Sequence, residues 1–164
     1  MLQRRPSSFG FTLIELLIVL GVFAVLAVMI APALTPTVAS RDLETSAATA
    51  TDALRRAQAN VMTGRDFTRW GVHFQADRFV LFSGAAYSAG NADNIVTVLS
   101  GEVRVTAVSL SPGGACAVAT GIGNCDVHFA MTEGMPTEPG TVTMTSANET
   151  RTITVNAAGM TAFQ

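Results

Sequence analysis

Two cysteines and two histidines in the second half of the chain are the side chains best suited to chemistry. Cys116 and Cys125 enclose a loop of eight residues, AVATGIGN. They can form one disulfide or remain as two reduced, buried thiols. A zinc site that combined them with His73 and His128 would lack the paired ligand spacing of known zinc sites. We therefore expect no metal here, and structural roles for both histidines, which lie in strand-like patterns.

The remaining polar patterns point away from catalysis. Asn91, Asp93 and Asn94 lie within the sequence GNADN, which has too few carboxylates for a calcium loop and predicts a turn. The chain has no G-x-S-x-G elbow, no P-loop, no H-E-x-x-H motif and no evident carboxylate pair. The sequence therefore predicts a protein that is not an enzyme and needs no cofactor.

Glu15 is the one ionisable residue in the apolar run over residues 11–34. A carboxylate in a bilayer costs a few kcal/mol, so such a residue is expected to be functional and to have a partner. The nearest positive groups in the chain are Arg4 and Arg5. A cut near Glu15 would supply another, the new α-amino group.

Composition limits the classes of protein that need to be considered. The chain has 164 residues, of which 49% are hydrophobic and 13% are charged, with a net charge of -2. This hydrophobic content excludes intrinsic disorder. The slight negative charge argues against a nucleic-acid or anionic-membrane binder that relies on excess positive charge.

The apolar run is long enough to span a membrane. As a helix, residues 11–34 would extend about 36 Å, against a hydrocarbon core of about 30 Å. Arg4 and Arg5 should stay in the cytoplasm by the positive-inside rule, which places the remainder of the chain outside. On that face an oxidised Cys116–Cys125 pair is expected.

An ordinary signal peptide or the transmembrane helix of an unrelated anchored protein could also produce an apolar run. A signal peptide would account for the small-x-small site at residues 31–33, but its apolar region is usually shorter and rarely carries an acid near its start. Both stay open as alternatives, and the choice depends on whether the residues around Glu15 form a recognisable motif.

Residues 10–16, GFTLIEL, resemble the class III signal of type IV pilins and type II secretion pseudopilins. The resemblance implies that a prepilin peptidase cuts between Gly10 and Phe11 and methylates the Phe11 amine. It also implies that Glu15 pairs with the Phe11 amine of a neighbouring subunit during or after filament assembly. Pro32 matches a proline common in pilin helices, where it permits a kink.

The apolar pattern beyond the run predicts that the helix continues to about residue 62. An apolar stripe recurs at alternating steps of four and three, through Leu43, Ala47, Ala50, Leu54, Ala57 and Val61. Gly64 is a plausible stop. We expect this stripe to pack against a sheet rather than to form a coiled-coil seam.

The last hundred residues are predicted to form antiparallel strands. Three hairpins are expected: 67–74 with 78–82, 95–99 with 102–108 through Ser100-Gly101, and 141–145 with 152–155 around Ala147-Asn148. A further strand is expected at 127–131, with loops at 83–94 and 111–125. The predicted fold class is α+β, a long N-terminal helix packed against antiparallel β-sheets in a pilin-like arrangement.

Four segments follow from these patterns. They are a prepilin leader over 1–10, a transmembrane and filament-core helix over 11–34, its amphipathic continuation over 35–64, and an antiparallel β-domain outside the membrane over 65–164. The resulting topology is a single pass through the inner (cytoplasmic) membrane, with the β-domain periplasmic or at the cell surface.

A second, more diffuse resemblance narrows the family. Residues 54–59 up to Gly64, the hairpin that follows, and RTITV at 151–155 followed by Gly159 resemble the H-type minor pseudopilins. This implies a structural subunit of a type II secretion filament, with a type IV pilus minor pilin as the alternative. The implied partners are a prepilin peptidase, other pilins or pseudopilins through the N-terminal helix, an assembly-platform membrane protein, and membrane lipid before assembly.

A DNA-uptake receptor pilin is the less favoured alternative. The C-terminal residues 157–164 carry no positive side chain. Arg65, Arg69 and Arg78 could gather near the first hairpin, but Asp66 and Asp77 stand beside them. Because phosphate neutralisation needs several unpaired cations, nucleic acid is not an expected partner.

Overall fold

The computed structural model describes residues 11–119, 125–131, 133–147 and 149–164, without the side chains of 28–37 and 66. Contacts divide the chain into two units, one ending at Thr37 and one from Val38 to Gln164. The helix α1 (Leu13–Met62) contributes residues to both units.

The predicted helix and its stop are confirmed. After Met62 the chain turns at Gly64, whose φ of 66° is the left-handed conformation that favours glycine. The Gly64 N–H donates to the Val61 carbonyl at 3.0 Å, which satisfies one of the last carbonyls of the helix. Pro32 lies outside the residues whose side chains are described, so its kink stays a prediction.

No helix within the described part of the chain is both long enough and apolar enough to cross a membrane.

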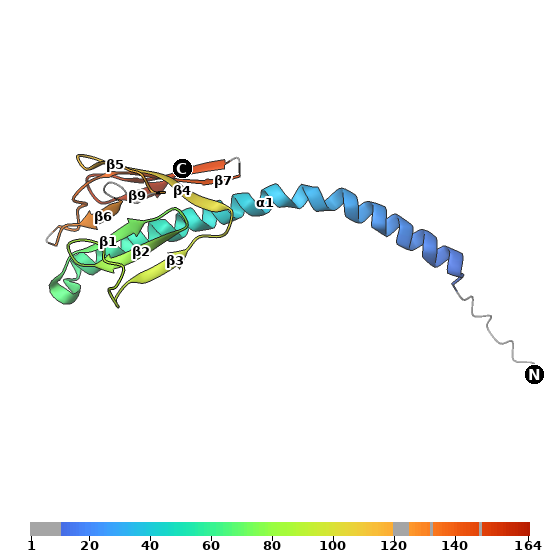
Figure 1. Ribbon diagram of the computed structural model, residues 1–164, viewed down its shortest axis with the longest axis horizontal. Helices are drawn as coiled ribbons and strands as arrows, with labels where there is room; N and C mark the ends of the chain where they lie inside the picture. The colour runs from blue at the N-terminus through green and yellow to red at the C-terminus, as the bar shows by residue number, and fades with distance from the viewer. Residues whose placement is uncertain (1–10, 120–124, 132, 148) are drawn as a thin grey trace, which may run out of the picture. The chain divides into compact units, whose positions relative to one another are not determined.

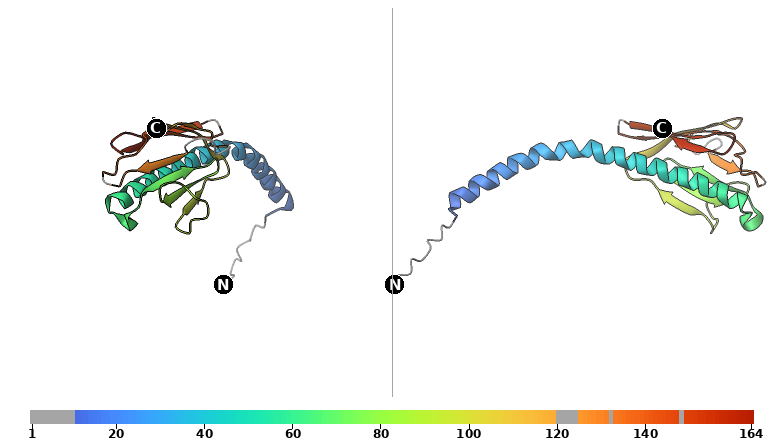
Figure 2. Two further views of the ribbon diagram at one scale, coloured as in Figure 1. Left: turned by 60° about the vertical axis from the view of Figure 1, so that its left-hand side comes forward. Right: turned by 180° about the vertical axis from the view of Figure 1, so that it is seen from behind.

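In the second unit, the stripe on α1 is the surface that meets the sheets, as predicted. Its six members are almost fully buried and belong to one core together with residues of both sheets. Figures 1 and 2 show both sheets lying along this part of α1. Alanine at three of the six positions adds little side-chain volume between the helix backbone and the strands.

The first sheet has four strands in the order β3-β2-β1-β6. They are β1 (Trp70–Phe74), β2 (Arg78–Ser83), β3 (Ile95–Val98) and β6 (Asp126–Phe129). The short helix η1 (Arg65–Phe67) precedes β1. β1 and β2 pair antiparallel, with Phe74 opposite Phe79, so the first predicted hairpin is confirmed.

The second sheet has five strands in the order β5-β4-β7-β8-β9. They are β4 (Val103–Leu110), β5 (Gly114–Cys116), β7 (Gly140–Ser146), β8 (Glu149–Val155) and β9 (Thr161–Phe163). The β7–β8 hairpin is confirmed, with Ala147 at a positive φ of 46° in its turn. The sequence did not predict β5 or β9, because three residues are too few for a periodic signal.

The predicted hairpin at Ser100-Gly101 is wrong. The Val103 N–H does donate to the Ser100 carbonyl at 2.9 Å, so a tight turn forms. However, β3 pairs with β2 in the first sheet, while β4 pairs with β5 and β7 in the second. The local turn signal cannot distinguish a hairpin from a crossover, because the partner of each strand depends on contacts between residues distant in sequence.

Candidate functional site

The first turn of α1 is the candidate assembly site. The Glu15 N–H donates to Thr12 Oγ1 at 3.3 Å, and the Leu16 N–H donates to the Thr12 carbonyl at 3.2 Å. Thr12 is therefore the N-cap, and Glu15 lies in the turn where the helix dipole favours a carboxylate. This role of Thr12 was not predicted, although T-x-x-E is the sequence pattern of a capping box.

Apolar side chains surround Glu15 without cover from the rest of the described chain. Phe11 is 81% exposed and Leu13 is 78% exposed, and every residue from 11 to 27 is exposed. Gly10, the other residue of the predicted cleavage site, lies outside the described residues. A contiguous apolar surface of this kind needs lipid or neighbouring protein around it.

The two cysteines form a disulfide that connects the sheets. Cys116 ends β5 at one edge of the second sheet, and Cys125 directly precedes β6 at one edge of the first. Their Cα atoms are 5.2 Å apart and both side chains are buried. The Phe74 N–H donates to the Cys125 carbonyl at 3.0 Å, which fixes Cys125 beside β1.

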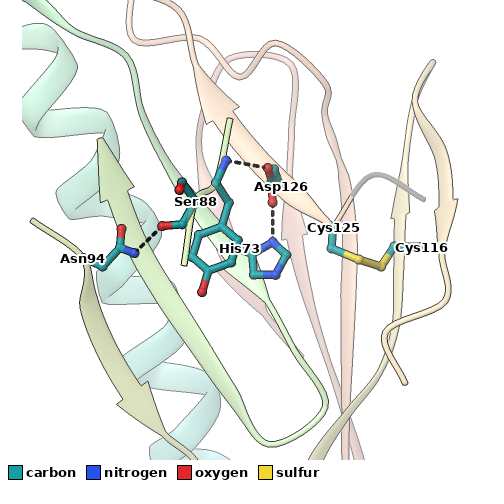
Figure 3. Close-up of polar contacts among 7 residues, drawn as sticks. His73, Ser88, Asn94, Cys116, Cys125 and Asp126 are labelled. Carbon is teal, nitrogen blue, oxygen red and sulfur yellow. Dashed lines mark hydrogen bonds and ion pairs between the residues drawn. A yellow bond between two sulfur atoms is a disulfide. The ribbon is translucent and has the colours of Figure 1, made fainter. Parts of the chain in front are cut away.

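His73 forms a small cluster on the face of the first sheet opposite the helix (Figure 3). Its Nδ1 lies 2.5 Å from Asp126 Oδ1, across the β1–β6 pair. The Tyr87 ring stacks on the His73 ring with centroids 4.0 Å apart, and the Tyr87 N–H donates to Asp126 Oδ2 at 3.3 Å. Asp126 and Tyr87 were missed because no local signal in the sequence indicates a contact across 53 residues.

His128 takes a different position from His73. Its ring meets the Phe82 ring edge-on, with centroids 5.3 Å apart. Its Nε2 atom is buried and has no hydrogen-bond partner among the described residues. The structural role expected of both histidines is therefore supported by a side-chain hydrogen bond at His73 and by ring packing at His128.

The predicted turn at residues 91–94 forms. Asn91 Oδ1 accepts from the Asp93 N–H at 3.1 Å. The Asn94 amide donates to the Ser88 carbonyl at 2.8 Å, as Figure 3 shows. The two asparagines thus hold the loop through hydrogen bonds to its backbone. Within the described residues, no three His, Cys, Asp or Glu side chains gather closely enough to hold a metal ion.

The three arginines considered for DNA do not share one end of the first hairpin. Arg69 directly precedes β1, whereas Arg78 begins β2 at the opposite end of the pair. Arg78 forms a two-point contact with Asp77, at 3.0 and 2.8 Å. This hydrogen bonding lowers the pKa of the Asp77 carboxyl and raises the pKa of Arg78. Arg65 lies over the Trp70 ring at 5.4 Å.

Comparison with known proteins bears on the N-terminal segment alone. Residues 5–31 match the family model of the prokaryotic N-terminal methylation motif. No curated protein and no solved structure gives a significant match to the chain. The motif supports a type IV pilin-like protein, either a pilin or a pseudopilin. It implies a membrane-anchored N-terminus, processing by a prepilin peptidase, and assembly with other pilins.

Proposed function

We propose that this chain is a structural, non-catalytic minor pseudopilin that is assembled into the filament of a type II secretion system. Residues 11–34 anchor it in the cytoplasmic membrane before assembly, and the β-domain over 65–164 faces the periplasm or cell surface. A minor pilin of a type IV pilus is the alternative within the same class. The two differ in their partners rather than in the chemistry of the chain.

The observation that carries the proposal is the contrast between the two ends of α1. One face of its second half is buried in a core with two sheets, whereas residues 11–27 are exposed and apolar around a single carboxylate. The methylation motif covers this exposed segment. Lateral packing of such segments from several subunits would bury their apolar surface and hold a filament together.

Glu15 gives the packing its register. After cleavage between Gly10 and Phe11, the new amine of one subunit can pair with the Glu15 carboxylate of a neighbour. Away from water, such a charge-assisted pair is stronger than at a protein surface. An unpaired Glu15 in the same place would be costly.

Processing is the first test. The mature protein should begin with methylated Phe11, and loss of Arg4 and Arg5 should change the formal net charge from -2 to -4. Mass spectrometry of the N-terminal peptide measures this. A mature chain that begins after Ala33 would contradict the proposal.

Assembly is the second test, for which Glu44 offers a matched control because it is an exposed glutamate on the same helix. Glu15→Gln and Glu15→Leu should reach the membrane and be cleaved normally, but enter the filament poorly. Glu44→Gln should assemble like the natural chain. Equal recovery of all variants in sheared filaments would contradict the role of Glu15.

Deletion of the gene distinguishes a secretion filament from a type IV pilus. Loss of protein secretion with intact surface pili supports the secretion filament, and the reverse supports the pilus. Neutralising Arg65, Arg69 and Arg78 together should leave assembly unchanged. A DNA receptor would be indicated instead if this triple change abolished DNA binding by the purified protein at moderate salt.

A further inference from the structure

Sheet edges are sites where a protein can pair with another chain, and in the part of the chain that the structure describes three of the four edges are covered or short. The edge of β6 is covered, because the Ala130 N–H donates to the Met135 carbonyl at 2.8 Å and the Thr137 N–H donates to the His128 carbonyl at 2.9 Å. The outer strands of the second sheet, β5 and β9, have three residues each. Covering an edge and shortening an edge strand are both common ways to prevent unwanted pairing.

The fourth edge, β3, lacks this protection. It is the outermost strand of the first sheet, with β2 on one side and no strand among the described residues on the other (Figure 1). Ile95, Val96 and Val98 are 54%, 51% and 66% exposed. Neither a proline nor a charged residue interrupts the sequence IVTV. These features make a template for another strand.

At two positions the backbone of β3 presents N–H and C=O groups that pair with no other described strand. The Leu99 N–H donates to the Asp77 carbonyl at 2.9 Å, so Leu99 and Asp77 form a hydrogen-bonded pair. In the antiparallel register with β2, such pairs alternate along the strand. Ile95 and Thr97 therefore bond toward β2, whereas the N–H and C=O groups of Val96 and Val98 point away from the sheet.

A groove runs beside this edge, between β3 and α1. Two adjoining hollows form it and share Thr49, Phe79 and Thr97 as lining residues. Asp42 lines one end. Asp52 and Arg56 line the other end of the groove. Asp52 Oδ1 also lies 3.8 Å from Arg55 Nη1.

Negative charge lies at both ends of the strand. Asp93 is exposed two residues before β3, and Glu102 is exposed four residues after its end. Arg78 lies opposite Val98, but its charge is balanced by Asp77. Arg56 lines the groove beside Asp52, and Arg104 lies near enough to Asp77 to help lower its pKa. Asp93 and Glu102 at the two ends of β3, and Asp42 in the groove, are therefore the charges that a positively charged segment would face.

We propose that β3 is the docking edge for an extended segment of another protein, which adds a fifth strand to the first sheet. The segment has β-branched residues at alternate positions to pack beside Val96 and Val98, and lysine or arginine at its ends to face Asp93 and Glu102. A second copy of this chain fits poorly. Antiparallel pairing of two β3 strands would bring Asp93 of one copy toward Glu102 of the other.

A fluorescent peptide, KTVTVTK, tests the proposal by fluorescence polarisation with the full chain in detergent micelles. Val96→Pro removes an outward N–H and spares the bonds to β2, as proline does at sheet edges. Val96→Thr keeps the N–H and is the matched control. We expect Val96→Pro to weaken binding about tenfold, and Val96→Thr to change it less than about threefold.

Peptides with opposite charges at their ends provide an independent test of the proposed charge preference. The peptide ETVTVTE should bind at least about tenfold more weakly than KTVTVTK, because its ends repel Asp93 and Glu102. The double variant with Asp93→Asn and Glu102→Gln should reduce this difference and the sensitivity to salt. Unchanged urea midpoints, measured by Trp70 fluorescence, establish that the variants are folded.

Three results would overturn the proposal. They are absence of KTVTVTK binding, equal binding by Val96→Pro and Val96→Thr, and equal binding of the two peptides. A different outcome would also overturn it: the natural chain cross-links as a dimer in these micelles, whereas Val96→Pro stays monomeric. In that case β3 pairs with a second copy of the chain. These results concern the β3 edge and leave the proposed role of the N-terminal helix untouched.

Discussion

Reducing the Cys116–Cys125 bond should lower the free energy of unfolding of the unit from Val38 to Gln164. The bond closes a loop of ten residues, given a sequence separation of nine. In the chain-entropy description, opening such a loop costs about 2.5–3 kcal/mol. Because the bond joins β5 to the start of β6, its loss also removes a covalent link between an edge strand of each sheet.

Urea unfolding followed by Trp70 fluorescence measures this loss. Trp70 is the single tryptophan of the chain and is 3% exposed, so its emission reports on the core between the sheets and α1. With a urea dependence of about 1.5–2 kcal/mol per molar, reduction should lower the midpoint by about 1–2 M. The melting temperature should fall by about 8–12 °C.

The double variant with serine at Cys116 and Cys125 is the control for reductant. Its midpoint should lie near that of the reduced natural chain and should not respond to reductant. Alkylation of the unreduced, folded protein should leave both cysteines unlabelled. The reasoning is refuted if oxidised and reduced midpoints agree within about 0.3 M, which corresponds to about 0.5 kcal/mol, or if both cysteines label readily before reduction.

Two further predictions use the same Trp70 readout. Leu54→Ala, at a fully buried position of the stripe, should lower the free energy of unfolding by about 2–5 kcal/mol. Met62→Ala, at the exposed end of α1, should change it by less than about 0.5 kcal/mol. Similar urea midpoints for the two variants would show that burial of the stripe does not stabilise the fold. Arg78 lowers the pKa of Asp77, so the stability from this pair is present above the usual pKa, about 4, and is lost as pH falls through the lowered folded value. The difference in midpoint between the natural chain and Asp77→Asn should therefore shrink from pH 6 to pH 3, and a constant or growing difference would contradict the assignment.

The sequence alone determined the features that depend on local repetition. The stripe from Leu43 to Val61 follows the helical period, and Gly64 can adopt the positive φ that ends the helix, so both the face and the end of α1 were predictable. The hairpins β1–β2 and β7–β8 combine period-two patterns with short connections, which fixes their pairing. Position and residue type together also made residues 10–16 recognisable as a methylation motif.

Tertiary structure decided the contacts between residues distant in sequence. The turn at Ser100-Gly101 leaves open whether β3 pairs with β4 or with β2, and in the structure β3 pairs with β2 while β4 pairs with β5 and β7. His73 meets Asp126 only because β6 returns to pair with β1. The exposed edge of β3 has the same cause, since an edge exists only once all strands have found their partners. Local sequence specifies backbone conformation, but long-range burial selects the neighbours of each strand.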